Sequence, residues 1–371
     1  MSELKHQHKV ENRYLSGILA LAGVVFIWVS SSFAMNSLFG SMEYNKPFLV
    51  TYINTSTFSF YLIPLLFKRR KYKHTVSEME EHKALLIKND AETINYTYLS
   101  ESDKNSNKNI DPLHHKLTTL QTIKLSLTFC IIWFIANYTT NASLAYTSVG
   151  SSTIIASMSG LFTLAIGALF KVEKLNLTKM VAVFISLIGV SLVSYSDNND
   201  DMTASGSSSF APLIGDLLAM LGALFYGCYT TFLKLKIGNE DRIDMPLFFG
   251  FVGVFNVLLL WPIIPILNYT GLETFEIPMN ATLWIVIILN AFIGTFVSDY
   301  LWLLSMLMTS PLVVTLGISL TIPLALVGDI VFKGIIPSMH YTIGAMLVIA
   351  GFLAVNSSAF KEAKQKQDSI N

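Results

Sequence analysis

The feature that most constrains this chain is a succession of ten long apolar blocks. Each block holds roughly 20 predominantly apolar residues, the length that an α-helix needs to cross the ~30 Å hydrocarbon core of a bilayer. Only 13% of the 371 residues are charged, against about 25% in soluble domains. The sequence therefore predicts an all-α polytopic membrane protein with ten transmembrane helices. The blocks begin near Tyr14, Phe48, Ile123, Gly150, Met180, Leu213, Pro246, Leu283, Pro311 and Met339.

The distribution of basic residues predicts the orientation of these helices. If the N-terminus is cytosolic, ten spans place the C-terminus there too. Every Lys and Arg except Lys46 and Lys333 then falls on the cytosolic side or at a cytosolic helix end, as membrane proteins prefer. We therefore expect a cytosolic N-tail (1–13), a cytosolic C-tail (358–371) and a lumenal loop at 196–210.

One long segment, 68–121, lies outside the apolar blocks. It is charged, rich in Asn, Ser and Lys, and without apolar periodicity, which predicts a disordered cytosolic loop. Within it, Glu81, Leu85 and Leu86 match an acidic di-leucine sorting signal, an address that a sorting adaptor reads. Hexamers of this kind also arise by chance, so an unused signal is the alternative.

Recognisable motifs outside the spans are few. Asn268 and Asn280 each begin an Asn-x-Thr sequon on the predicted lumenal side. Such sequons predict N-glycosylation. The equally weighted alternative is that both sites lie too close to the membrane to be glycosylated. The sequence contains no P-loop, HExxH or GxSxG motif, and its histidines and cysteines lack metal-ligand spacing. We therefore expect no enzyme activity, no cofactor and no metal site, and the composition gives no reason to expect a nucleic-acid partner.

An internal repeat organises the ten blocks. Shifting the sequence by 162 residues aligns the third to fifth spans with the eighth to tenth without a gap, and a shift of 199 aligns the first span with the sixth. Each repeat therefore holds five spans, and because five is odd the second copy enters from the opposite face. Two inverted five-helix repeats are an architecture of secondary transporters, which bind substrate at the repeat interface.

This repeat sets the predicted boundaries of the chain. Between the two tails they are helices 1 and 2 at 14–67, the loop 68–121, helices 3 to 5 at 122–195, the lumenal loop 196–210, and helices 6 to 10 at 211–357.

Asp299 stands in an otherwise apolar block and aligns with Asn137 of the first repeat. Each is followed by a tyrosine, Tyr300 and Tyr138 respectively. A charge at membrane depth costs several kcal/mol and normally faces a cavity or a partner, yet no Lys or Arg lies in the interior of a span. One interpretation is a cavity carboxylate that binds a cationic substrate or carries a proton. The other is an acid near the cytosolic end of its helix, wetted by the interface.

Several further polar and aromatic residues are candidates for the cavity wall. Ser157 and Ser319 are repeat counterparts, although serines in membrane helices more often bind a neighbouring helix than a substrate. Asn141 lies one turn beyond Asn137. Trp28, like Tyr138, could stack on a planar ligand or belong to an interfacial aromatic belt. Small residues predict close helix packing at Gly160, Gly167, Gly189, Gly344 and Gly351.

Four segments together resemble a known family. They read YNKPFLVTYINTSTFSFYL (44–62), WFIANYTTNASLAYTSVGSSTIIASMSGLFTL (133–164), YGCYTTFLK (226–234) and SDYLWLLSMLMTSPLVVTLGISLTIPLALVGD (298–329). Over 14–357, apart from the cytosolic loop, the chain resembles the EamA-like drug/metabolite transporter superfamily. Within it, the chain looks like subfamily F of solute carrier family 35 and its fungal vacuolar relatives.

The resemblance implies secondary-active transport of a small organic metabolite by alternating access, in the lipid bilayer of an endomembrane, most simply the vacuolar membrane. The wider family includes nucleotide-sugar carriers, and some fungal relatives carry a thiamine-linked name. A diphosphate would require cavity Lys or Arg, so the acid-only span interiors favour a cationic or neutral substrate, with proton coupling as an option. A non-transporting receptor or scaffold that uses loop 68–121 is the alternative, and glycine-rich faces also fit a homodimer.

Overall fold

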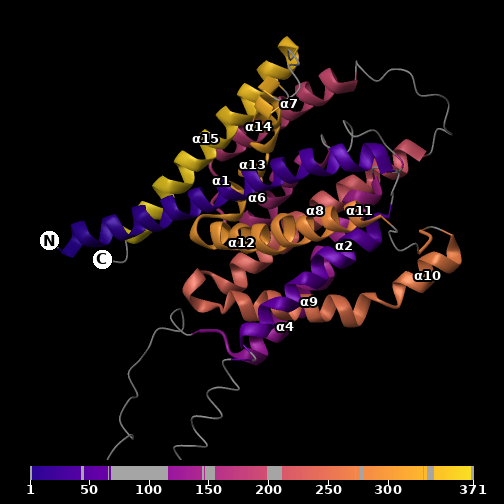
Figure 1. Ribbon diagram of the computed structural model, residues 1–371. Coiled ribbons are helices and arrows are strands. Elements are labelled where there is room, and N and C mark those ends of the chain that lie inside the picture. Colours follow the sequence, from indigo (N-terminus) through magenta and orange to yellow (C-terminus); the bar gives the residue numbers. More distant parts are fainter. Residues whose placement is uncertain are drawn as a thin grey trace, which may run out of the picture.

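Helices form every regular element that the computed structural model describes (Figure 1). The described residues are 2–42, 46–65, 67, 116–143, 146, 155–198, 211–271, 273–275, 280–328, 330–331 and 338–368. In chain order the elements are α1 (Ser2–Met42), α2 (Pro47–Ser56), η1 (Thr57–Tyr61), α4 (Thr119–Ser143), α6 (Ser159–Leu169), α7 (Leu177–Asn198), α8 (Ala211–Ile237), η3 (Glu240–Arg242), α9 (Met245–Leu260), α10 (Ile263–Thr270), α11 (Ala281–Leu289), η4 (Asn290–Val297), α12 (Ser298–Met308), α13 (Pro311–Ile318), α14 (Thr321–Gly328) and α15 (Met339–Asp368).

Six of the described helical segments are long and apolar enough to cross a membrane: Glu11–Ser31, Phe48–Leu65, Thr119–Thr140, Leu213–Ile237, Ala281–Met308 and Met339–Gln365. A seventh candidate is the pair α9 and α10, which is bent by 43°. Three shorter apolar helices cover Ile155–Leu169, Leu177–Val193 and Pro311–Leu324. The described residues therefore agree with a polytopic, all-α membrane protein.

Helix ends and bends follow local sequence chemistry. The Asp244 carboxylate accepts a hydrogen bond from the Leu247 amide at 3.1 Å and caps the start of α9. The Ser310 hydroxyl does the same for the Val313 amide at 3.3 Å, ahead of α13. Such caps satisfy amides that the helix itself leaves unpaired. Pro262 lies at the junction of α9 and α10, where its missing amide explains the bend.

Helices α7 and α15 lie side by side at one edge of the bundle (Figure 1) and touch through glycines. A Cβ added to Gly189 would stand 2.6 Å from the Gly344 carbonyl oxygen, and one added to Gly344 would stand 2.5 Å from the Gly189 carbonyl oxygen. These separations are too short for real carbon atoms, so the two backbones are in direct contact. The predicted close packing at these glycines is confirmed.

The remaining helices enclose the centre of the bundle. Helix α4 packs on α8, α1 packs on α12, and α9 packs on α4 and η1. Aromatic side chains fill the space among them: Phe58, Phe129, Phe248 and Phe249 are each no more than 1% exposed. Ring centroids lie 5.0 Å apart for Phe58 and Phe249, and 5.2 Å apart for Phe129 and Phe248. These rings join η1, α4 and α9 in one buried core.

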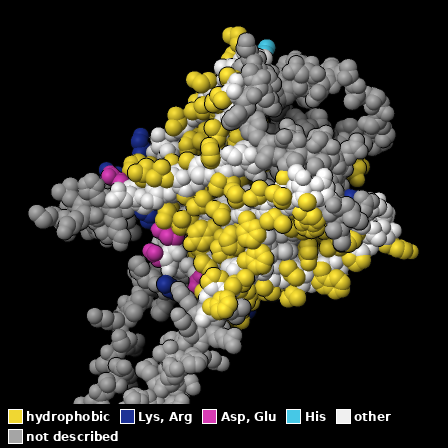
Figure 2. All heavy atoms as spheres, viewed as in Figure 1, with side chains coloured by type: hydrophobic (Ala, Val, Ile, Leu, Met, Phe, Trp, Pro, Cys, Tyr) yellow, Lys and Arg dark blue, Asp and Glu magenta, His cyan; other side chains and the backbone are white. Residues whose placement is uncertain are grey.

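The outer surface has an apolar face and a charged edge (Figure 2). Hydrophobic side chains cover the visible face, whereas most visible Lys, Arg, Asp and Glu gather near the chain termini. On α8, for example, Leu213 and Leu217 are 64% and 60% exposed. Exposed leucines one helical turn apart form a face suited to lipid rather than water.

The two terminal helices meet at this charged edge (Figure 1). The Tyr14 hydroxyl donates to the Asn356 side-chain oxygen at 2.7 Å, and Lys364 lies 3.9 Å from Glu11. Helix α1 begins within the predicted N-tail and α15 continues through most of the predicted C-tail. The tails therefore extend the outer spans as helices where the structure describes them.

The contact between α7 and α15 generates a stability prediction. Gly189→Ala or Gly344→Ala should lower the free energy of unfolding by about 1–3 kcal/mol, because an added methyl group forces two packed backbones apart. Thermal unfolding of the purified protein in detergent measures this change. Gly23→Ala is the matched control, since its added Cβ would have Leu301 at an ordinary 3.7 Å as nearest neighbour. Equal effects of all three substitutions would contradict the backbone contact.

Candidate functional site

Asp299 lies in the first turn of α12, and its residue is 9% exposed. Among the residues that the structure describes, none hydrogen bonds to its carboxylate or forms an ion pair with it. The side chain borders a cavity of about 560 Å³ at the centre of the bundle. Ligand-binding pockets typically have volumes of about 300–1,000 Å³. The cavity is therefore large enough for a small organic molecule.

The walls of this cavity come from both halves of the sequence. Hydroxyl and amide side chains supply much of the wall: Thr51, Asn54, Asn137, Thr140, Ser157, Ser159, Thr295, Thr315, Ser319 and Thr321. The Asn54 side-chain oxygen is buried and has no hydrogen-bond partner in the described part of the chain. Asp299 is the sole Asp, Glu, Lys, Arg or His among the described lining residues. The site thus combines one carboxylate with many neutral polar groups.

Aromatic side chains form a second part of the wall: Trp28, Trp133, Tyr226, Tyr229 and Trp302. Three of them make one cluster. The Trp302 indole nitrogen donates to the Tyr226 hydroxyl at 3.3 Å, and the ring centroids of Tyr229 and Trp302 lie 5.7 Å apart. Edge-to-face contacts of this kind hold rings in fixed orientations.

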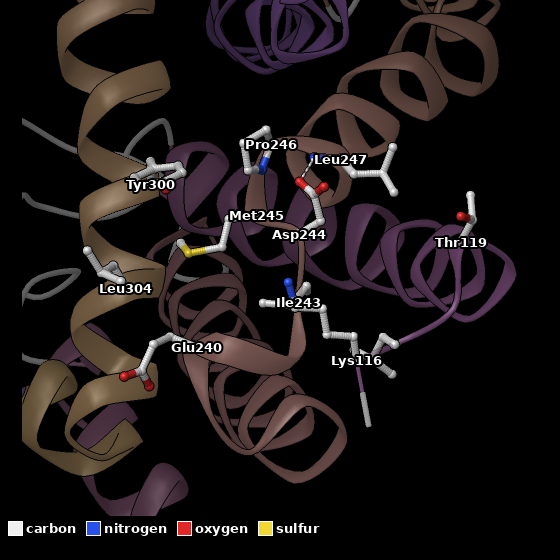
Figure 3. Close-up of a pocket in the computed structure, with 11 residues that line it drawn as sticks. Lys116, Thr119, Glu240, Ile243, Asp244, Met245, Pro246, Leu247, Tyr300 and Leu304 are labelled. Carbon is white, nitrogen blue, oxygen red and sulfur yellow. Dashed lines mark hydrogen bonds between the residues drawn. The ribbon is translucent and has the colours of Figure 1, made fainter. Parts of the chain in front are cut away.

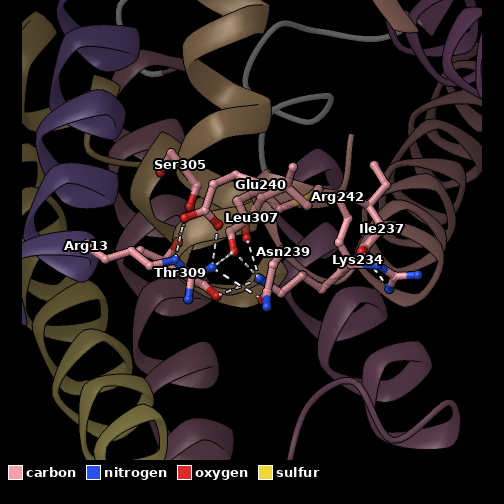
Figure 4. A network of polar contacts seen from close by, with 10 residues as sticks. Arg13, Lys234, Ile237, Asn239, Glu240, Arg242, Ser305, Leu307 and Thr309 are labelled. Carbon is pink, nitrogen blue, oxygen red and sulfur yellow. Dashed lines mark hydrogen bonds and ion pairs between the residues drawn. The ribbon is translucent and has the colours of Figure 1, made fainter. Parts of the chain in front are cut away.

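Basic and acidic side chains gather at one end of the bundle, which we call the charged end and define by Arg13, Lys234 and Glu240 (Figure 4). The Arg13 guanidinium binds both carboxylate oxygens of Glu240 and donates to the Leu307 carbonyl at 3.2 Å. Lys234 donates to the carbonyls of Leu307 and Thr309 at 2.5 and 3.1 Å. A cation at this position satisfies carbonyls that the end of α12 leaves unpaired.

The direction of each helix places the aromatic groups between Asp299 and the charged end. Helix α12 runs toward that end, so Trp302 lies one turn closer to it than Asp299. Helix α4 starts there, because the Leu117 amide donates to the Arg242 carbonyl at 2.8 Å. Trp133 is therefore one turn closer to the charged end than Asn137. We call Trp133, Tyr226, Tyr229 and Trp302 the aromatic floor of the cavity.

Five of the predicted site residues line this one cavity: Asp299, Asn137, Trp28, Ser157 and Ser319. Two others do not. The Tyr138 ring packs against Phe48 and Phe134, with centroids 6.0 and 6.4 Å away. Tyr300 borders a separate pocket, described next. The side chain of Asn141 and the whole of Glu81, Leu85 and Leu86 lie outside the described residues.

A second pocket, of about 520 Å³, lies at the charged end between α12 and the start of α9 (Figure 3). Tyr300 and Leu304 project into it from α12, opposite Met245 and Pro246. Lys116 and Asp244 lie at its border. Adjacent residues of α12 thus face two different spaces, because successive side chains on a helix point about 100° apart.

A π-helical segment, η4, directly precedes Asp299. The Ser31 hydroxyl on α1 donates to the Asn290 side-chain oxygen at 2.6 Å, and the Ser298 hydroxyl donates to the Gly294 carbonyl at 2.5 Å. A Cβ on Gly294 would stand 2.6 Å from that same Asn290 oxygen, so a larger residue there would displace the Asn290 side chain. Short π-helical segments are rare overall, but those that occur often lie at functional sites.

The aromatic floor and η4 are the parts of the site that sequence reasoning missed. A spacing signal was present: Trp302 follows Asp299 by three residues, as Tyr229 follows Tyr226, and such pairs share a helix face. The π-helical segment has no comparable signal in the sequence. Among the described residues, no cluster of three His, Cys, Asp or Glu has a geometry suited to a metal ion.

The two predicted glycosylation residues lie at the end of the bundle opposite the charged end. Both are exposed, and both use their side chains locally. The Asn280 oxygen accepts from the Thr282 amide at 2.9 Å, and the Asn268 oxygen accepts from the Phe275 amide at 2.8 Å. Their glycosylation stays a prediction.

Comparison with known proteins gives relatives over nearly the full length. Residues 109–195 match the EamA-like transporter family. An uncharacterized vacuolar membrane protein of Saccharomyces cerevisiae is 41% identical, over 96% of this chain and 94% of that protein. A thiamine-repressible mitochondrial transport protein of the same yeast is 38% identical, over 92% of each chain. Solute carrier family 35 member F5 of Pongo abelii is 33% identical, over 92% of this chain and 77% of that protein.

A solved crystal structure of a protein with 13% sequence identity superimposes with a TM-score of 0.62, over 93% of this chain and 98% of that one. At this level of identity the likeness concerns the fold alone.

The Arg13–Glu240 pair at the charged end generates a pH prediction. Burial raises the pKa of the Glu240 carboxyl, but hydrogen bonds from Arg13 and the charges of Arg13 and Lys234 outweigh it, so the pKa lies below its ordinary value. A carboxyl with a lowered folded-state pKa stabilises the protein fully above its unfolded-state pKa, about 4.3, and loses that contribution as the pH falls through the folded-state pKa. Glu240→Gln should therefore cost about 1.5–3 kcal/mol at pH 7, and the cost should shrink as the pH is lowered from 7 through the folded-state pKa.

Thermal unfolding of the purified protein and of Glu240→Gln across this pH range measures the difference. Asp241→Asn, the exposed neighbour, is the control and should unfold like the parent protein at each pH. A Glu240→Gln effect of the same size at every pH would rule out the ion pair as its source.

Proposed function

Because this chain belongs to the EamA-like transporter family, in the branch that contains solute carrier family 35 member F5 and fungal vacuolar membrane proteins, we propose that it is a secondary-active transporter of a small organic metabolite. The names of its relatives support membrane transport rather than catalysis. Transport proceeds by alternating access to the Asp299 cavity, with a cationic or neutral substrate, a thiamine-like solute included, and with proton coupling as an option.

The proposed architecture is ten spans in two inverted repeats, at 14–67 with 122–195 and at 211–357. Each of the ten apolar blocks contains one of the ten apolar helical units described above, counting α9 and α10 as one. Helix contacts support the repeat, because the counterparts of two helices that pack together also pack together. Helix α4 packs on α8, and their counterparts α12 and α1 pack on each other. Helix α6 packs on α8, and their counterparts α13 and α1 also pack together.

Helix directions support the inversion. Helices α4 and α1 begin at the charged end, whereas their counterparts α12 and α8 finish there, as the contacts of Leu117, Arg13 and Lys234 indicate. We propose that the charged end, with both tails and the loop 68–121, is cytosolic, because membrane proteins keep Lys and Arg on that side. The loop 196–210 is then lumenal.

The observation that carries this proposal is the buried carboxylate of Asp299, which has no partner among the described residues and borders a central cavity walled by both halves of the sequence. Ionisable groups at membrane depth mark substrate and proton pathways. A nucleotide-sugar substrate fits this wall poorly, since the described lining offers no Lys or Arg to its phosphates. Residence in the vacuolar membrane is proposed because the relative with that name is 41% identical, against 38% for the mitochondrially named one.

Uptake of labelled metabolites into proteoliposomes or isolated vacuoles tests this function. The parent protein should show saturable flux with at least one solute, and Asp299→Asn should reduce it about tenfold or more, because a charged hydrogen-bonding group worth about 1.5–3 kcal/mol is lost. Asp241→Asn, outside both pockets, should retain the flux. Unimpaired flux in Asp299→Asn would remove Asp299 from the site, and absence of flux with every solute would favour a receptor or scaffold that works through loop 68–121.

A further inference from the structure

We infer that the Asp299 cavity selects a flat organic cation that carries N–H donors, with the aromatic floor as the surface on which its ring stacks. This inference rests on the proposed transport function and names its substrate class. It assigns substrate specificity to Trp133, Tyr226, Tyr229 and Trp302.

The charge of Asp299 favours a cationic substrate. The Asp299 carboxylate is nine-tenths buried, and among the described lining residues no basic side chain faces it. Two largely buried lysines outside this lining have partners of their own. Lys179 lies 2.8 Å from both Glu173 and Glu362, and Lys234 binds the carbonyls at the end of α12. A substrate cation in the cavity would therefore provide the missing counter-charge, whereas an anion would be repelled.

The aromatic floor favours a flat substrate. Trp302 lies one helical turn from Asp299 on α12, and Trp133 lies one turn from Asn137 on α4; Tyr226 and Tyr229 line the same cavity from α8. The Tyr226 and Tyr229 centroids are 5.1 Å apart, and Trp302 contacts both rings. An aromatic ring face attracts a cation and stacks on a planar ring. A flat cation can use both properties at once, while its positive charge remains within reach of Asp299.

The hydrogen-bonding capacity of Asp299 favours a cation that carries N–H groups. An ionised carboxylate can only accept hydrogen bonds, and an acceptor left without a donor in a buried site is costly. N–H groups at the rim of the substrate would donate to the Asp299 carboxylate, which a quaternary cation without N–H groups cannot do.

Other occupants fit less well. A metal ion would need several charged or carbonyl oxygens around one point, and no cluster of three ligating side chains is present among the described residues. A neutral sugar would leave the buried carboxylate without a counter-charge, and an unpaired buried charge is strongly destabilising. The cavity of about 560 Å³ also exceeds what a bare ion requires.

A matched set of three probes with one ring tests this inference: 1-methylnicotinamide (positive), nicotinamide (neutral) and nicotinate (negative). Tetraethylammonium serves as a cation with no ring and no N–H group. Binding of each labelled probe to the full-length protein in detergent is measured by equilibrium dialysis, and uptake of the same probes is measured in proteoliposomes. We expect 1-methylnicotinamide to bind about tenfold or more tightly than nicotinamide and tetraethylammonium, and nicotinate to bind least.

Two variants separate charge from stacking. Asp299→Asn should remove the preference for 1-methylnicotinamide over nicotinamide, while leaving the neutral probe bound. Trp302→Leu should weaken both ring probes several-fold without changing their order. If Trp302→Leu fails to fold, Tyr226→Leu, at a half-buried position of the aromatic floor, takes its place. Asp241→Asn is the control and should match the parent protein with every probe.

Equal binding of the three ring probes, absence of binding by 1-methylnicotinamide, or an unchanged preference in Asp299→Asn would overturn the inference. Charge-selective binding without uptake would instead leave the substrate class standing and remove the proposed transport function. Uptake that prefers nicotinamide or nicotinate would have the reverse meaning, with transport supported and the cation site refuted.

Discussion

An acid surrounded by apolar helices imposes a requirement on the whole molecule, because a charge at membrane depth costs several kcal/mol unless something compensates it. Here the described residues around Asp299 leave a polar cavity and supply no counter-charge to the carboxylate. Arg13 and Lys179 are paired elsewhere, Arg13 with Glu240 and Lys179 with Glu173 and Glu362. A cation that enters the cavity would supply the missing counter-charge.

The two helices that the proposed repeat pairs, α4 and α12, differ in chemistry. Helix α4 carries the amide of Asn137 on a regular α-helix, whereas α12 carries the carboxylate of Asp299 two residues after the end of the π-helical η4. The Asn137 side chain donates to the Trp133 carbonyl at 2.9 Å, whereas the Asp299 carboxylate has no hydrogen-bond or ion-pair partner among the described residues. A single charge at these two paired positions avoids the repulsion that two nearby carboxylates would suffer.

The helices and the central cavity could be predicted from the sequence, because a lipid bilayer allows a chain few kinds of folded structure. A spanning segment must pair its backbone groups internally, so the apolar blocks predicted helices and the lone acid predicted a cavity. The repeat alignment identified Asn137, Ser157 and Ser319 as cavity residues, because it pairs each position in one half of the sequence with a position in the other half. Tyr300 and Tyr138 could not be placed in the same way, because their direction depends on helix rotation. The π-helical segment shifts that rotation by backbone pairing alone, and Trp302 and Tyr229 reach the cavity only through the packing of α8 on α12.

The aromatic wall has an optical consequence. The chain has five tryptophans, and three of them, Trp28, Trp133 and Trp302, border the central cavity. Trp261, by contrast, is 56% exposed on the outer surface. Most of the indole fluorophores therefore border the central cavity. The protein carries a built-in spectroscopic sensor, and its near-ultraviolet emission reports on solutes in that space without any attached dye.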